Sequence, residues 1–312
     1  MTYSRVLIVR RATRLQELIA RFNTKPQARF YIESAGGDFV DYDAEDAAYR
    51  RSLEEVEQSV RELAKVHVID RGFLPNYVFA DDELVVVVGQ DGLVANTAKY
   101  ALARPIVGVN PEPARYDGVL LPFEPKTAPA AIRVALEGQA HVRHVSMAAA
   151  KLNDGQHLLA FNDFFVGVKS HVSARYRIAA HGKSEEQSSS GVLVSTGAGS
   201  TGWLSSVFNM AAGVAQFTGA TLRAPKPLPW NARELRFVVR EPFVSRTSAA
   251  AIVAGKLKEN EALEIESRMP AGGVIFSDGV EQDFLQFNSG ATVRLGLAPV
   301  SAQLVVPLPG RR

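Results

Sequence analysis

The feature that most constrains the fold is a run of apolar residues, Leu84–Val88, followed at once by Gly89-Gln90-Asp91-Gly92. An uninterrupted apolar run rich in valine is typical of a strand that is buried on both faces of a parallel sheet. A helical pattern follows over Asn96–Leu102. Because parallel strands need a crossover connection, usually a helix, this segment predicts a strand–turn–helix unit of an α/β domain.

Residues up to about 110 repeat this alternation of strand and helix patterns. Short apolar runs predict further strands at Val6–Val9, Ala28–Ile32, Val66–Ile69 and Ile106–Val109. Apolar residues at three- and four-residue steps predict helices over 15–22 and 44–65, the second strongly amphipathic. We therefore expect an α/β N-terminal domain with a parallel, Rossmann-like sheet over residues 1–122.

The pattern changes after about residue 120. A helix is expected over Ala128–Glu137, and short strand-like segments with turns between them follow it. Short strand-like segments, several of which alternate apolar and polar residues, predict strands at 141–145, 175–179, 235–239, 262–266, 273–276 and 292–295. Ser184–Ser190 is expected to form a polar loop or hairpin tip. We expect a β-rich, mostly antiparallel C-terminal domain over residues 123–297. Residues 298–312 are expected to form a C-terminal tail ending in Arg311-Arg312, with packing against the N-terminal domain as one arrangement for it.

The composition is that of a globular protein, with 46% hydrophobic and 22% charged residues in a chain of 312. The formal net charge is only +2, which argues against nucleic acid as a partner. The absence of cysteine excludes disulfides and thiol-based metal sites and fits a cytoplasmic protein. No apolar run approaches the roughly 20 residues of a spanning helix, so no membrane span is expected.

The turn Gly89-Gln90-Asp91-Gly92 is a candidate phosphate site. Glycines between a buried strand and a helix allow backbone N–H groups to approach a phosphate. Asp91 would stand beside those phosphates, where a carboxylate can hold Mg²⁺ or accept a proton from an attacking hydroxyl. The alternative interpretation is an ordinary strand-to-helix turn in which Asp91 caps the helix.

Three further polar segments stand out in the second half of the chain. Val192–Trp203 combines a strand pattern with a loop of small and hydroxyl residues, and the start of a helix follows it; a Ser/Thr-capped helix with Trp203 in the core is the simpler interpretation. Asn162-Asp163 interrupts an apolar run and needs partners, either from the protein or from a ligand. Ser277-Asp278-Gly279 reads by itself as a hairpin turn.

Taken in order, these segments resemble the NAD kinase family, within the wider group that includes diacylglycerol and sphingosine kinases. The family has a Gly-Gly-Asp-Gly turn, an Asn-Glu pair, a Thr-Gly-Ser-Thr-Ala-Tyr-like segment and a late Asp-Gly. This chain carries Gly89-Gln90-Asp91-Gly92, Asn162-Asp163, Gly199-Ser200-Thr201-Gly202-Trp203 and Asp278-Gly279 in the same order. The lead-in Gly191–Thr196 is also similar to that of the family, and the resemblance spans roughly residues 5–297.

The resemblance implies an ATP-dependent kinase that uses Mg²⁺ and phosphorylates a hydroxyl of NAD or a related nucleotide, forming NADP in the case of NAD. It implies that Asp91 is the catalytic aspartate or the residue that organises the metal, and that Gly89, Gln90 and Gly92 lie at the ATP phosphates. By the same resemblance, the substrate would be bound by Asn162, Asp163, Gly199, Ser200, Thr201 and Trp203. The family also suggests a homodimer or homotetramer.

Several positions differ from the family pattern, mostly on the acceptor side. Gln90 stands where the family has glycine, Ser190 where it has aspartate, and Gly202-Trp203 where it has Ala-Tyr. One alternative is therefore a lipid or sugar kinase of the same superfamily; a sizeable apolar pocket beside Trp203 would favour a lipid. Another alternative is a non-catalytic nucleotide-binding protein.

Overall fold

The computed structural model describes residues 3–308, and the chain divides into two compact units. The first, here called the α/β unit, takes the residues up to Arg143 together with those from Gln303 onward. The second, here called the β unit, is His144–Ala302. The chain thus leaves the α/β unit once and returns to it. The functional domain boundaries at 122 and 297 stay a prediction.

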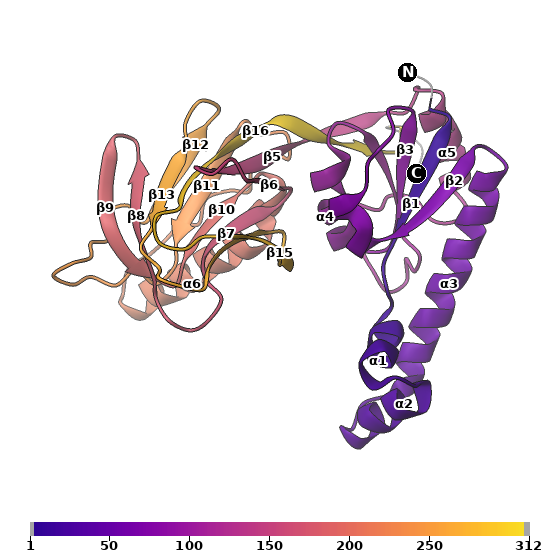
Figure 1. The fold of residues 1–312 in the computed structure, drawn as a ribbon, viewed down its shortest axis with the longest axis horizontal. Coiled ribbons are helices and arrows are strands. Elements are labelled where there is room, and N and C mark those ends of the chain that lie inside the picture. The colour runs from indigo at the N-terminus through magenta and orange to yellow at the C-terminus, as the bar shows by residue number, and fades with distance from the viewer. Residues whose placement is uncertain (1–2, 309–312) are drawn as a thin grey trace. The chain divides into compact units, whose positions relative to one another are not determined.

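The α/β unit is built on a parallel sheet in the order β2-β1-β3-β4, of which Figure 1 labels the first three strands. Its strands are β1 (Arg5–Arg10), β2 (Lys65–Asp70), β3 (Glu83–Val88) and β4 (Pro105–Val109). Every residue of β3 and β4 is buried, as the apolar runs predict for strands covered on both faces. At the edge of this sheet, Gln303 and Leu304 of β16 (Thr292–Val305) pair in parallel with β4.

Helices cover both faces of this sheet. One face packs on α3 (Phe39–Arg61) and α5 (Ala128–Leu136) through a shared apolar cluster. The helix α4 (Asp91–Ala101) contacts β3 and β4 and contributes nothing to that cluster, so it covers the other face. The short 3-10 helix η1 (Arg71–Asn76) contacts α4 and β2. The predicted α/β arrangement is confirmed.

The strand expected at Ala28–Ile32 is wrong, because this segment lies inside the helix α2 (Lys25–Ser34). The side chain of Thr24 caps the helix by accepting from the backbone N–H of Gln27, and Pro26 lies in the first turn. Only Ala28 is fully buried, in a small cluster with Leu15 of α1 (Arg14–Phe22) and Phe39 of α3. Capping and burial on one side therefore stabilise a helix here, although the residue types favour a strand.

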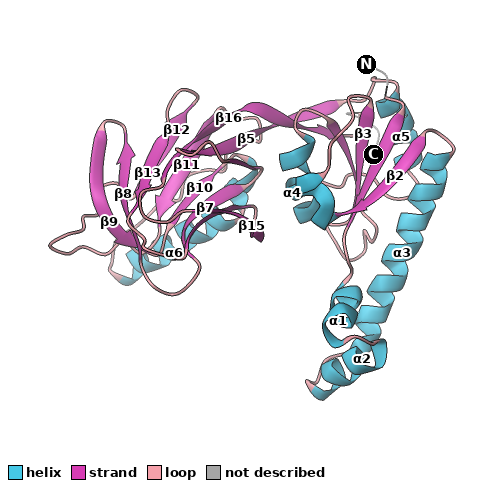
Figure 2. Ribbon diagram, viewed as in Figure 1, coloured by secondary structure: helices cyan, strands magenta, loops and turns pink. Residues whose placement is uncertain are grey.

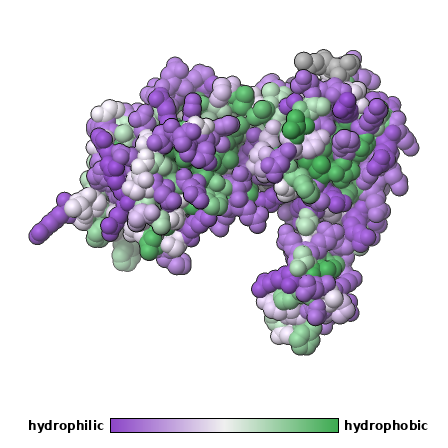
Figure 3. Space-filling model, in the orientation of Figure 1, coloured by the Kyte–Doolittle hydropathy of each residue, from purple (hydrophilic) through white to green (hydrophobic). Residues whose placement is uncertain are grey.

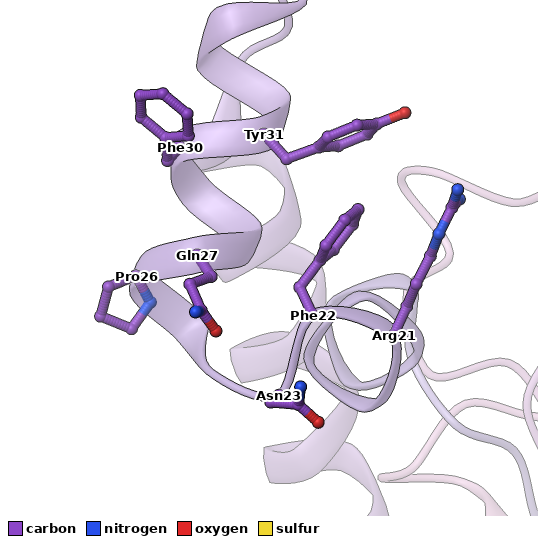
Figure 4. A pocket seen from close by; sticks show the side chains of 7 residues that line it. All are labelled: Arg21, Phe22, Asn23, Pro26, Gln27, Phe30 and Tyr31. Atoms are coloured by element: carbon purple, nitrogen blue, oxygen red, sulfur yellow. The ribbon is translucent and has the colours of Figure 1, made fainter.

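The hairpin of α1 and α2 exposes aromatic side chains. Phe30 is 74% exposed and Tyr31 is 45% exposed, and hydrophobic residues appear among hydrophilic ones on this part of the surface in Figure 3. The rings of Phe22 and Tyr31 are tilted by 32° to each other with centroids 4.5 Å apart, and Figure 4 shows both among the side chains that line a cavity of about 570 Å³. Apolar surface of this kind is common on monomers and needs no function by itself.

The β unit is a sandwich of two sheets (Figure 2). One sheet has the order β12-β11-β10-β7-β14-β15, and all of its strand pairs are antiparallel. Its strands are β7 (Asp163–Val168), β10 (Val192–Ser195), β11 (Glu234–Val239), β12 (Ala254–Lys258), β14 (Gly273–Ser277) and β15 (Val280–Gln286). The other contains β16, β13 (Leu263–Ser267), β8 (Ala174–Ala180) and β9 (Lys183–Ser189), with β5 (Val142–Leu152) and β6 (His157–Ala160). One large apolar cluster fills the space between them, so the expected β-rich, antiparallel half is confirmed.

The segment Ser184–Ser190 is not the polar loop or hairpin tip expected from its composition, because most of it forms β9. The tip is His181-Gly182, where both residues have positive φ, 50° and 74°. Along β9 only Gln187 and Ser189 are buried, and both hydrogen-bond the hydroxyl of Tyr176 on β8. Polar side chains can line a strand when the interior supplies such partners.

The helix α6 (Trp203–Phe217) covers part of the outer face of the β7-containing sheet. It packs through Leu204 on Leu193 and Val238 of that sheet, with Trp203 at the edge of the cluster. The predicted helix from Leu204 is thus confirmed. Within residues 3–308, no helix is both long and apolar enough to cross a membrane.

Candidate active site

In the α/β unit, the Gly89–Gly92 segment joins the buried end of β3 to the first turn of α4. Gln90 occupies the N-cap position but makes no side-chain capping bond, and Asp91 is the first helical residue. A Cβ atom on Gly89 would lie 2.8 Å from Cδ2 of Leu93, so a larger residue there would require the Leu93 side chain to move. Gly92 is exposed with open space around it. The space beside Gly92 lies at the start of α4, where the first amides of a helix have no carbonyl partner four residues earlier.

The carboxylate of Asp91 is held by a loop that follows β4. Its two oxygens accept hydrogen bonds from the backbone N–H groups of Leu120 at 2.8 Å and of Val119 at 3.3 Å. This loop passes so close to β4 that a Cβ on Gly108 would lie 2.2 Å from the carbonyl oxygen of Leu120. Asp91 is thus partly buried and fixed in orientation between its own helix and the loop.

The same loop is tied to α3 by an ion-pair network. Arg115 donates to both oxygens of Asp41 at 2.7 and 3.2 Å, and Arg14 donates to Asp41 as well. Hydrogen bonds from Arg115 and Arg14 lower the pKa of Asp41 to about 2. The amide of Asn110, at the end of β4, donates to the carbonyl of Tyr116 at 2.8 Å. The loop that orients Asp91 therefore has anchors on two neighbouring elements.

In the β unit, three segments far apart in the sequence line one cavity of about 380 Å³. They are the start of β7, the 3-10 helix η2 (Ala198–Thr201) with the first residue of α6, and the turn between β14 and β15. The lining residues are Asn162, Asp163, Ala198, Gly199, Thr201, Gly202, Trp203, Asp278 and Gly279. Motifs that are up to about 115 residues apart in the chain thus converge on a single pocket.

Close backbone packing joins two of these segments. A Cβ on Gly199 would lie 2.2 Å from the carbonyl oxygen of Asn162, so only glycine fits there. The hydroxyl of Thr196 donates to the carbonyl of Phe161 at 2.6 Å and accepts from the amide of Gly199. The small residues of this loop are therefore required by the strand beside it, whatever the pocket binds.

Ser200 lies differently from its neighbours in the motif. Its hydroxyl donates to the carbonyl of Gly197 at 2.7 Å and accepts from the amide of Leu228 at 3.1 Å. It is 6% exposed and does not line the cavity, whereas Thr201 is exposed and does. The fold uses the Ser200 hydroxyl to hold the loop together.

The pocket contains two neighbouring carboxyl groups, Asp163 and Asp278. Asp278 accepts from the backbone N–H groups of Asn162 at 2.6 Å and of Phe161 at 3.0 Å. Asp163 is only 8% exposed, and burial together with the nearby charge of Asp278 raises its pKa to about 7. No side-chain hydrogen bond to Asp163 is found among residues 3–308. Asp163 lines the cavity, so a ligand there can supply a hydrogen-bond partner for its carboxyl group.

Asp278 lines the site, although its sequence segment by itself predicted only a hairpin turn. The hairpin itself is confirmed, since Asp278 and Gly279 both have positive φ between β14 and β15. The carboxylate in addition organises the backbone of residues 161–163. The position of this Asp-Gly in the ordered series of motifs was the only sequence signal for it.

Two solved structures resemble this chain over nearly its whole length. Yeast NADH kinase in complex with NADH matches with a TM-score of 0.58 and 13% identity, covering 99% of this chain and 85% of that one. An NAD kinase from Archaeoglobus fulgidus in complex with ATP matches with a TM-score of 0.56 and 15% identity, covering 96% and 93%. No protein-family model and no curated protein matches the sequence. The chain therefore has the NAD kinase-like fold that its ordered motifs predict.

The predicted site residues fall into two groups. Gly89, Gln90, Asp91 and Gly92 belong to the α/β unit. Asn162, Asp163, Gly199, Thr201 and Trp203 belong to the β unit and share its pocket, with Ser200 just behind them.

Proposed function

We propose that this protein is an ATP-dependent kinase that phosphorylates a hydroxyl group of NAD or a related nucleotide. The observation that carries the proposal is the convergence of Asn162-Asp163, Gly199–Trp203 and Asp278 on one pocket, in a fold shared with an NADH kinase and an NAD kinase. Fold alone does not define activity, so the argument depends on these side chains.

The Gly89–Gly92 turn suits a nucleotide phosphate. Gly92 leaves room at the N-terminus of α4, where orphan amides and the helix dipole favour an anion. Among residues 3–308, no group of three or more carboxylates and histidines could hold a metal by itself. We assign Mg²⁺ to the ATP phosphates with one or two protein carboxylates as further ligands, and the candidate here is Asp91. The ion would neutralise phosphate charge.

We assign to Asp91 the task of accepting the proton of the attacking hydroxyl or of orienting the metal. Its fixed orientation supports this role, because the amides of Val119 and Leu120 hold the carboxylate in place before any ligand arrives. Gly89, Gln90 and Gly92 would line the phosphates.

We assign the acceptor to the pocket of the β unit. Asp163 and Asn162 offer hydrogen-bonding groups for ribose hydroxyls or an adenine edge, and Thr201 adds an exposed hydroxyl. Trp203 offers an aromatic face for a planar base. A ribose hydroxyl would give the carboxyl of Asp163 a hydrogen bond that no side chain among residues 3–308 supplies. Homodimeric or homotetrameric assembly and a cytoplasmic location belong to the same proposal.

The test is turnover of NAD and NADH with ATP and Mg²⁺, in the wild type and in Asp91→Asn. We expect the variant to lose at least about 100-fold in kcat, the usual range for a removed general base, with ATP affinity within a few-fold. Asparagine keeps an oxygen for the amide of Leu120, so thermal unfolding should be nearly unchanged. Full activity in Asp91→Asn would overturn its assigned role.

The same assay separates the other candidates. If the protein phosphorylated a sugar or lipid alcohol but not NAD, the proposed acceptor would be wrong and the proposed kinase activity would be retained. Binding of ATP and NAD by calorimetry without turnover of any acceptor would indicate a non-catalytic nucleotide-binding protein.

A further inference from the structure

A second cavity of about 530 Å³ lies beside Trp203 in the β unit, outside the proposed acceptor pocket. Its size is within the usual range for small-molecule sites. The residues that line it are Phe165, Val168, Lys169, Trp203, Arg240, Val274, Phe276, Glu281, Gln282 and Phe284. Trp203 is the only residue that lines both this cavity and the acceptor pocket within residues 3–308.

The apolar wall of this cavity consists mainly of aromatic rings. The ring of Phe165 stacks on Trp203, with centroids 5.7 Å apart and planes inclined by 13°. The ring of Phe165 also contacts the ring of Phe276, with centroids 5.0 Å apart. Such a wall offers flat surface to a planar ring, whereas an acyl chain would be expected to need an aliphatic channel.

Two cationic side chains lie over aromatic rings that line this cavity. The guanidinium of Arg240 lies 5.3 Å from the Trp203 centroid, and Nζ of Lys169 lies 3.3 Å from that of Phe284. The Arg240 side chain is only 28% exposed, and its carboxylate contact is a long one of 3.8 Å to Glu241. Lys169 makes no ion pair with any residue from 3 to 308.

From these contacts we propose that the cavity binds a planar aromatic ring that carries one anionic group, either phosphate or carboxylate. The ring would pack on the aromatic wall, and the anion would pair with Arg240 and Lys169. Arg240 is largely withdrawn from water and weakly paired, so an anion there gains more than at a solvated surface. Glu281 on the rim limits the favourable charge to a single anionic group.

This site would be distinct from the acceptor pocket and coupled to it. Because Trp203 forms a wall of both cavities, a ligand that fixes its ring on one side changes the surface offered on the other. The thermodynamic consequence is reciprocal: an acceptor bound in one pocket and a planar anion in the other would alter each other's affinity by the same factor.

The test uses phenyl phosphate as the probe. Phenol, which has the ring alone, and inorganic phosphate, which has the anion alone, are the controls. Calorimetry on the full chain should give saturable binding of phenyl phosphate, with phenol and phosphate each about tenfold weaker or undetectable. In a Trp230→Phe background, Trp203 is the remaining tryptophan, and its fluorescence should change on binding. The assay needs neither ATP nor turnover, so failure of the kinase proposal leaves it interpretable.

Two substitutions locate the ligand. Arg240→Gln and Lys169→Gln should each weaken phenyl phosphate about fivefold, as expected for loss of one cation at a partly desolvated site. Lys169 is exposed, so its variant is expected to fold. Arg233→Gln, which removes an exposed arginine paired with Glu259 outside the cavity, should have no effect. Equal binding of phenyl phosphate and phenol, or unchanged affinity in both cavity variants, would refute the proposal.

Discussion

At the scale of the residue, Asp163 shows how the fold can change the chemistry of a side chain. An aspartate in water ionises near pH 4, whereas burial next to Asp278 raises the pKa of Asp163 to about 7. Between these two values the folded protein holds a proton on Asp163 that the unfolded chain has released. Stability contributed through this group is therefore present at low pH and is lost as the pH rises towards 7.

We predict that the free energy of unfolding of the wild type falls, relative to Asp163→Asn, as the pH rises from about 4 to about 7. The difference should be on the order of 4 kcal/mol at most, from a pKa displaced by about three units. Chemical denaturation at a series of pH values measures it.

Asp154→Asn is the matched control for that titration. Asp154 is exposed, and hydrogen bonds from Gln156 lower its pKa, so its contribution to stability is lost only as the pH falls below about 4 and should stay nearly constant between about pH 4 and pH 7. If Asp163→Asn and the wild type kept a constant difference across this range, Asp163 would titrate like an ordinary exposed carboxyl.

The glycines of the site make a related point about single residues. A Cβ on Gly199 would meet the backbone of Asn162 at 2.2 Å, so glycine is needed there, whereas a Cβ on Gly89 would meet only the end of the Leu93 side chain at 2.8 Å. Sequence reasoning suggested that small residues there let a ligand approach. In the fold each makes room for the protein itself, for Leu93 in one case and for the backbone of Asn162 in the other.

At the scale of the element, the loop after β4 decides how Asp91 is held. We predict that Arg115→Gln, which removes both hydrogen bonds to Asp41, increases hydrogen exchange at the amides of Val119 and Leu120 severalfold. If Asp91 acts as proposed, kcat should fall while the KM for the acceptor changes little. Mass spectrometry of the peptide that contains Val119 measures the exchange.

Arg294→Gln removes an exposed arginine that pairs with Glu264 in the β unit and serves as the control. It should leave exchange at Val119 and Leu120 unchanged. Equal exchange in Arg115→Gln and the wild type would mean that the loop keeps its position without the Asp41 contact. The proposed catalytic role of Asp91 would be unaffected by that result.

Elements were predictable where one face of a regular pattern meets a core. The strands β1, β3 and β4 and the helix α3 follow from apolar runs and helical spacing, because burial of those residues dominates their stability. The failures, α2 and β9, both bury few side chains and depend on contacts that composition does not reveal. For α2 these are the Thr24 cap and one buried alanine, and for β9 the buried hydroxyl of Tyr176.

At the scale of the whole molecule, the chain returns at its end to the unit in which it began. The last part of β16 pairs with β4 and places Leu304, 3% exposed, and Val305 in the interior of the α/β unit. Residues 298–305, which the sequence assigned to a tail, thus continue a strand that begins in the β unit. Arg311-Arg312 lies outside the described residues.

We predict that Leu304→Ala lowers the free energy of unfolding by about 2–5 kcal/mol, the usual cost of truncating a buried leucine. Leu308→Ala, four residues further on at a side chain that is 60% exposed, should change it by less than about 0.5 kcal/mol. Scanning calorimetry of both variants tests this. Equal effects of the two substitutions would contradict the place of Leu304 in the core.

The sequence by itself determined the α/β and β-rich halves and the order of the motifs, because hydrophobic periodicity and glycine-containing turns are local properties. Only the tertiary structure decided that Asn162-Asp163, Gly199–Trp203 and Asp278 share one pocket, and that Ser200 faces inward. It alone raised the pKa of Asp163 and placed Arg240 and Lys169 on aromatic rings beside Trp203. The physical reason is that burial and charge proximity arise between residues far apart in the chain, where spacing along the sequence carries no information.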